Sequence, residues 1–179
     1  IDIFKFKETA VPEFENSYKD FLDHFNNFFK LLKLSKESPL FSLSLSDLNQ
    51  KTSRELKEIL KKSDPAFRAA FNLLDYKEVD GFNLGYSGSL RGASIGIKFK
   101  FLLLKAAKDL LNLEIDDPEV FCLLPFLQEG IGCDRISDMF ISINYIHFLK
   151  YTERKLKELS FDNTTEIELN GKKYELFIP

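Results

Sequence analysis

The chain has 179 residues, of which 44% are hydrophobic and 30% charged, and this length and composition suit one globular domain and exclude a disordered chain. Its formal net charge is −3, and the 25 basic residues are interspersed with 28 acidic ones, so the basic footprint of a dedicated nucleic-acid module is missing. No run of 18 apolar residues occurs, which excludes a membrane partner for this segment and leads us to expect a cytoplasmic protein.

Most of the chain shows the apolar spacing of amphipathic helices. Residues 1–7 are the first exception, because they alternate with a period of two and predict a short strand or an extended arm. Pro12 suits the first turn of the helix that follows, and Ser46 or Asp47 can cap the next one. An apolar run near Pro125 fits either a helix turn or a buried strand. The segments with helical spacing are 11–34, 46–62, 64–74, 97–113 and 134–159.

The last residues form two alternating runs around Asn170-Gly171, the preferred pair for a tight hairpin turn. An isolated two-stranded hairpin is only marginally stable, so we expect a sheet that continues in a longer protein. The predicted fold class is mainly α (α+β). It comprises a multi-helix, bundle-like domain over residues 1–160 and a short C-terminal β-hairpin over residues 161–179.

Chemically capable side chains are densest over residues 129–138. Asp134 and Asp138 are four residues apart on a predicted helix and share one face, where two carboxylates could bind a divalent cation or share a proton. A glycine turn could fold Glu129 toward them, and Arg135 lies between them in sequence. The candidate catalytic residues are therefore Glu129, Asp134, Arg135 and Asp138, and the candidate metal ligands are Asp134 and Asp138.

A purely structural interpretation of the same residues competes with this one. Asp134 would be a helix N-cap, Asp138 would favour the positive end of the helix dipole, and Arg135 would pair with a neighbouring carboxylate. Caps and local ion pairs explain most such clusters at helix starts, so this interpretation is favoured about two to one.

A glycine-rich segment lies between residues 76 and 96. Here Ser87, Gly88 and Arg91 could present backbone amides and a guanidinium to a phosphate, and they are the candidate ligand-binding residues. The segment lacks the Gly-Lys-Ser/Thr of a Walker loop and a clear preceding strand. Gly88 and Gly96, with Gly92 between them, could instead let two helices pack closely.

Other chemistries are poorly supported. Neither histidine has an arginine four to six residues before it, which the helical HEPN ribonucleases require, and the two cysteines lack the spacing of a zinc site. No histidine is placed to activate Cys133. Two Glu-x-Lys matches, at Glu55 and Glu153, fall within predicted helices, whereas restriction-type nucleases place theirs on a strand. Both are interpreted as solvated helix faces.

Four strings resemble a family of uncharacterised bacterial proteins from mobile and defence-type gene neighbourhoods: Asp64-Pro-Ala-Phe-Arg-Ala-Ala-Phe, Leu84-Gly-Tyr-Ser87, Asp117-Pro-Glu and Glu129-Gly-Ile-Gly-Cys-Asp-Arg-Ile-Ser-Asp-Met139. The last string is the most specific, and the resemblance covers residues 60–179. It implies a chain that continues past the last strand, and it implies no particular activity. Cys133 stands where the family more often has a small residue or proline, which weakens the case for a catalytic thiol.

Two functions remain open. In the first, this is the N-terminal helical part of a bacterial, phage-defence-type protein that acts on or with nucleic acid or a phosphate ligand, with a divalent cation as the candidate cofactor. In the second, it is a non-enzymatic interaction or oligomerisation domain with a protein partner or a second copy and no active site. The missing basic footprint favours the second, and the polar cluster favours the first.

Overall fold

The computed structural model describes residues 3–76, 96–127, 132–160, 164–169 and 171–177. In these residues the fold is helical with a C-terminal hairpin, as predicted. Short 3-10 helices occur at η1 (Ile3–Phe6), η2 (Pro12–Phe14) and η3 (Pro39–Ser42). The longer elements are α1 (Ser17–Leu34), α2 (Leu45–Gln50), α3 (Ser53–Lys62), α4 (Pro65–Leu73), α5 (Ile97–Asn112), α6 (Val120–Leu127), α7 (Cys133–Ile143), α8 (Tyr145–Glu158), β1 (Thr164–Leu169) and β2 (Lys172–Phe177). No helix in the described ranges is long and apolar enough to cross a membrane.

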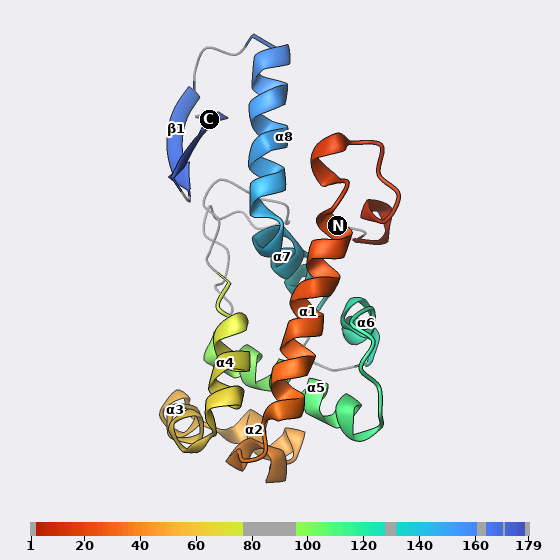
Figure 1. The fold of residues 1–179 in the computed structure, drawn as a ribbon. Coiled ribbons are helices and arrows are strands. Elements are labelled where there is room, and N and C mark those ends of the chain that lie inside the picture. Colours follow the sequence, from red (N-terminus) through yellow and green to blue (C-terminus); the bar gives the residue numbers. More distant parts are fainter. Residues whose placement is uncertain (1–2, 77–95, 128–131, 161–163, 170, 178–179) are drawn as a thin grey trace.

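Helix α1 is the centre of the molecule. It runs through the lower half of the fold in Figure 1 and packs against α4, α5 and α7. Its buried face carries phenylalanines at helical spacing, and Phe21, Phe25 and Phe28 are fully buried. Many of the chain's phenylalanines therefore fill the core, where aromatic rings contribute large buried areas.

The N-terminal segment differs from its prediction. Residues 3–6 form the 3-10 helix η1 and not a strand or an extended arm. The physical reason is tertiary packing: Ile3 is buried, and the ring of Phe6 contacts the rings of Phe14 and Phe140. Among the described residues no strand pairs with this segment, so packing against α1 and η2 decides the local conformation.

The single helix predicted over residues 46–62 is two helices, α2 and α3. Each begins with a reciprocal capping box, in which a hydroxyl accepts from the third backbone N–H and the carboxylate there accepts from the cap residue. Ser44 pairs with Asp47 in this way, and Thr52 pairs with Glu55. The second box starts a new helix immediately after α2 ends. The first box makes Ser44 the N-cap of α2, so neither Ser46 nor Asp47 is the cap.

Asp64 joins the loop after α1 to the start of α4. Its Oδ1 accepts from the backbone N–H of Phe67, which is the geometry of an N-cap. Its Oδ2 accepts from Ser35 Oγ at 3.0 Å and from the backbone N–H groups of Lys36 and Glu37 at 2.7 and 2.8 Å. These bonds lower the pKa of Asp64 to about 2, although its burial acts in the opposite direction.

The helix predicted over residues 134–159 is divided at Asn144 into α7 and α8. Asn144 has φ −98° and ψ 16°, outside the helical region, and it is both the C-cap of α7 and the N-cap of α8. Its Nδ2 donates to the carbonyl of Phe140 one turn earlier. A side chain bonded to the preceding turn competes with the helix's own hydrogen bonds, which explains the break.

The C-terminal residues form the predicted hairpin. Strands β1 and β2 pair antiparallel, with Leu169 opposite Lys172 on either side of the turn, and Gly171 has a φ of 73° that suits glycine. Tyr174 is buried where β2 packs against α8, and Ile167 lies opposite it on the same face. The hairpin therefore rests on a helix, which supplies the support that two strands alone lack.

Candidate functional site

The predicted cluster begins at the start of α7. Glu129 lies outside the described residues, and so does the side chain of Asp134. The backbone places the N-cap at Gly132, so Asp134 occupies the second position of the helix and its interpretation as the cap is wrong. A carboxylate in the first turn still favours the helix dipole. Asp138 follows one turn later and is exposed.

Arg135 connects this cluster to the start of α5. Its guanidinium lies over the ring of Phe99, 5.2 Å from the ring centroid, and Phe99 is buried. Within the described residues Arg135 thus contacts an aromatic ring. The purely structural interpretation of the sequence predicts a carboxylate partner instead.

The first turn of α5 is positively charged. It contains no acidic residue, and its N-cap, Gly96, makes no side-chain cap hydrogen bond. Lys98 is exposed and donates to the carbonyl of Asn49 at 2.5 Å. The positive end of a helix dipole normally attracts carboxylates, so lysines at this position are electrostatically unfavourable.

Lys100 is the buried cation of the same turn. Only 7% of the residue is exposed, and its ammonium group lies 2.8 Å from Asp75 Oδ1 and 4.8 Å from the centroid of the Phe71 ring. A buried lysine requires a partner of this kind. Asp75, which follows α4 and is well exposed, supplies one carboxylate to this site. The site has three cations: Lys98 and Lys100 of α5, and Arg135 of α7.

The glycine-rich segment leads into this turn. Ser87, Gly88 and Arg91 lie outside the described residues, whereas Gly96 is described. A Cβ atom added at Gly96 would meet no described atom within 4 Å. Close helix packing therefore does not explain glycine at Gly96. The structure nevertheless brings the two predicted candidate segments together at the start of α5. The glycine-rich segment ends at Gly96, the N-cap of this helix, and Arg135 of the second segment lies over Phe99.

A half-buried histidine–tyrosine pair lies next to Asp75. His24 Nε2 is 2.8 Å from the hydroxyl oxygen of Tyr76, which links α1 to the residues after α4. Desolvation lowers the pKa of His24 to about 4 and raises that of Tyr76, so both groups are neutral near neutral pH. No local sequence pattern indicates this pair, because its members are 52 residues apart.

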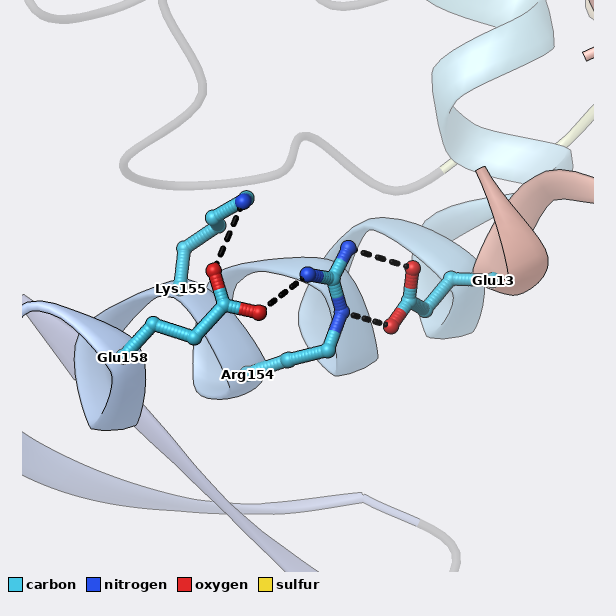
Figure 2. Close-up of polar contacts among 4 residues, drawn as sticks. All are labelled: Glu13, Arg154, Lys155 and Glu158. Carbon is cyan, nitrogen blue, oxygen red and sulfur yellow. Dashed lines mark hydrogen bonds and ion pairs between the residues drawn. The ribbon is translucent and has the colours of Figure 1, made fainter. Parts of the chain in front are cut away.

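A second polar group lies on α8, as Figure 2 shows. Glu13 of η2 accepts two hydrogen bonds from the guanidinium of Arg154, which also donates to Glu158, and Lys155 donates to the other oxygen of Glu158. The hydrogen bonds from Arg154 lower the pKa of Glu13. Every member of this group is paired, so its geometry fixes the N-terminal segment to α8 and leaves no evident reactive group.

Both Glu-x-Lys matches lie on helices, α3 and α8, as predicted. Glu55 belongs to the capping box of α3, where hydrogen bonds from Thr52 lower its pKa to about 2. Glu153 pairs with Lys157 along α8. Cys122 is buried, and burial raises the pKa of its thiol to about 11. In the part of the chain that the structure describes, no three histidine, cysteine or carboxylate side chains come together as a metal site.

Comparisons with known proteins add one assignment. No curated protein and no solved structure matches the chain. One family model matches residues 41–176, a range that includes α2 to α8 and nearly all of the hairpin. This match extends over more than half of the chain and agrees with the expectation of an uncharacterised family. The chain belongs to the family described as a domain of unknown function, DUF8370.

Proposed function

We propose that this chain is the helical part of a bacterial, cytoplasmic, phage-defence-type protein that acts on or with nucleic acid or another phosphate ligand. The ligand would bind at the start of α5, between Lys98 and Arg135. A nuclease-associated role in defence is part of the same proposal. The resemblance of the segment ending at Met139 to defence-associated proteins supports the biological context.

The observation that carries the proposal is the concentration of positive charge at the first turn of α5. Lys98 and Lys100 lie in this turn, and the guanidinium of Arg135 lies over its buried Phe99. These cations add to the positive end of the helix dipole, which disfavours them in the free protein. A bound phosphate would make the electrostatic energy of this turn favourable, because helix N-termini and guanidinium groups both bind phosphate oxygens.

Thermal melting with phosphate-bearing probes tests the proposal. The probes are inorganic phosphate, ATP and a short single-stranded DNA, added to the natural chain, to Lys98→Gln with Arg135→Gln, and to Arg54→Gln with Lys57→Gln. The last pair is the matched control, because it removes the same two residue types from the exposed face of α3. A ligand that binds only the folded state raises the melting temperature.

We expect at least one probe to raise the melting temperature of the natural chain and of the α3 control, and to leave the Lys98/Arg135 variant unchanged. Each shift is measured against the same variant without the probe, so a loss of intrinsic stability does not confuse the result. No shift with any probe, or an equal loss in the α3 control, would contradict the proposal.

The candidate divalent cation has a separate test. Asp134 and Asp138 would be its ligands, and Mg²⁺ or Mn²⁺ would then raise the melting temperature of the natural chain but not that of Asp134→Ala with Asp138→Ala. Asp109→Ala on α5, which removes an exposed carboxylate paired with Lys105, is the control for general charge effects. An unchanged melting temperature with both ions would remove the cation from the proposal.

The second candidate is a non-enzymatic domain that binds a protein partner or a second copy. The observation that favours it is the exposure of Leu34, Leu113 and Leu159 to between 66% and 71% at the ends of three helices. Sedimentation over a wide concentration range distinguishes a second copy from a different partner. A single monomeric species, together with a positive result at α5, would favour the phosphate proposal.

A further inference from the structure

Strand β1 is the outer strand of the hairpin. Strand β2 is the strand that packs against α8, and Figure 1 shows β1 on the side of β2 that faces away from this helix. In the described residues the sheet has only these two strands, and β1 pairs with β2 alone. Thr165, Glu166 and Glu168 are exposed. The far edge of β1 is therefore accessible to another strand.

The register determines which backbone groups line that edge. Leu169 and Lys172 flank a two-residue turn and are directly paired, so they exchange both of their backbone hydrogen bonds. Hydrogen-bonded pairs alternate along an antiparallel ladder, and Ile167 is therefore the next residue of β1 bonded to β2. The N–H and C=O groups of Glu168 and Glu166 point away from β2, toward the open edge.

The same two residues carry negative charge on the solvent face. Glu166 lies directly opposite Glu175, a like-charge pair that destabilises a ladder. Lys173 lies opposite Glu168 and bonds to Glu166 at 2.7 Å. This face therefore has three carboxylates for one ammonium group, and two of the three are on the edge strand. The hairpin itself does not require this excess.

These charges select the occupant of the edge. A second copy pairing antiparallel about Glu166 would place this carboxylate opposite its own counterpart, which disfavours self-association. A strand with lysine or arginine at alternate positions would instead place each cation beside Glu166 or Glu168. The residues between them would lie on the side of Ile167, which packs toward α8 with Tyr174, so apolar residues fit there.

We propose that β1 accepts a basic extended segment of another protein as a third strand, with lysine or arginine alternating with apolar residues. Main-chain hydrogen bonds to Glu166 and Glu168 would provide much of the affinity, and their carboxylates would select the charge. This edge is separate from the start of α5, and the inference does not depend on the phosphate proposal.

A labelled peptide with the sequence Lys-Val-Lys-Val-Lys-Val tests the inference by fluorescence anisotropy. Its counterpart, Glu-Val-Glu-Val-Glu-Val, is the charge control. Glu166→Gln with Glu168→Gln should weaken binding of the basic peptide by about tenfold, since two cross-strand charge pairs are lost. Glu15→Gln with Glu37→Gln removes two exposed carboxylates elsewhere and should leave the affinity unchanged.

The variant Glu168→Pro separates strand addition from simple charge attraction. Proline at this position removes an N–H that points to the open edge and retains the hydrogen bonds between β1 and β2. We expect it to abolish binding while the far-ultraviolet circular dichroism stays unchanged. A basic peptide with N-methyl groups at the amides that would face β1 tests the same bonds with the natural protein, and it should also fail to bind.

Three results would overturn the inference. One is no binding of the basic peptide to the natural chain, and another is equal binding of the acidic peptide. The third is undiminished binding of the N-methylated peptide, because charge alone would then explain the interaction. The Lys98→Gln with Arg135→Gln variant should bind the basic peptide normally, which distinguishes failure at this edge from failure at α5.

Discussion

The ring of Phe25 stacks on the ring of Phe121, with centroids 4.0 Å apart and planes inclined by 19°. Phe25 belongs to α1, which precedes the family match, and Phe121 belongs to α6, within it. Phe121 also contacts Phe28 and Phe29, so α1 surrounds one side of this ring. The core of the matched region is thus completed by residues that the family model leaves out.

We predict from this contact that the chain beginning at residue 41 does not fold. Phe25→Ala in the full chain should cost about 3–5 kcal/mol of unfolding free energy, the usual range for removing a fully buried phenylalanine. Phe4→Ala, at a half-exposed ring, is the control and should cost much less. Urea unfolding followed by circular dichroism measures both. A shortened chain with a cooperative transition would contradict the prediction.

The Glu13–Arg154 pair should make stability depend on acid. Arg154 lowers the pKa of Glu13 from its usual 4.5, so the folded state holds this carboxyl deprotonated more strongly than the unfolded state does. The resulting stability is present above pH 4.5 and is lost as the pH falls below it. We expect Glu13→Gln to lower the melting temperature at pH 7, and we expect the difference from the natural chain to shrink in more acidic buffer. A difference that is constant with pH would count against the pair.

His24 should produce a pH dependence at a higher range. Burial lowers its pKa from 6.5 to about 4, so the unfolded state binds more protons between these values, and stability rises with pH in this window. Its contribution should change the unfolding equilibrium constant by roughly tenfold per pH unit. Chemical denaturation from pH 4 to 7 should show that His24→Phe removes this slope. An unchanged slope would show that another group takes up the proton. His147→Gln, at the other histidine, is the control variant.

Asp64 should contribute more than an ordinary helix cap. Besides capping α4, it binds two backbone N–H groups and one hydroxyl of the loop after α1. A lost cap costs about 1 kcal/mol, and we expect Asp64→Ala to cost about 2 kcal/mol or more because the loop donors also lose their acceptor. Thr52→Ala, which removes a cap without such a loop, is the matched control in urea unfolding. Equal losses in the two variants would show that the loop bonds add nothing.

Local signals predicted the fold well where one helix face or one turn decides the structure. The apolar spacing around Phe21 and Phe25 located α1, and Asn170-Gly171 located the hairpin turn. A local signal also existed for the boundary between α2 and α3. Thr52 followed by Glu55 has the spacing of a capping box, which the prediction of one helix over residues 46–62 does not use.

Contacts between distant residues could not be predicted in this way. The 3-10 helix η1 depends on Phe6 meeting Phe140, and the His24–Tyr76 bond joins two elements with no spacing rule between them. At the candidate site, the functional role of Arg135 is a prediction from the sequence, and its position over Phe99 depends on how α5 and α7 pack. Glu129, Ser87, Gly88 and Arg91 remain sequence predictions.

The helix break at Asn144 determines the direction of α8 relative to α7. Its side chain is fully buried, and Oδ1 has no hydrogen-bond partner among the described residues, so this residue is held in place at an energetic cost. The 14 residues of α8 extend about 20 Å from it, and the hairpin packs along them. A rotation of about 5° in the backbone of Asn144 would therefore move a point at the far end of α8 by about 2 Å. The orientation of the hairpin therefore depends on one amide side chain at the junction of α7 and α8.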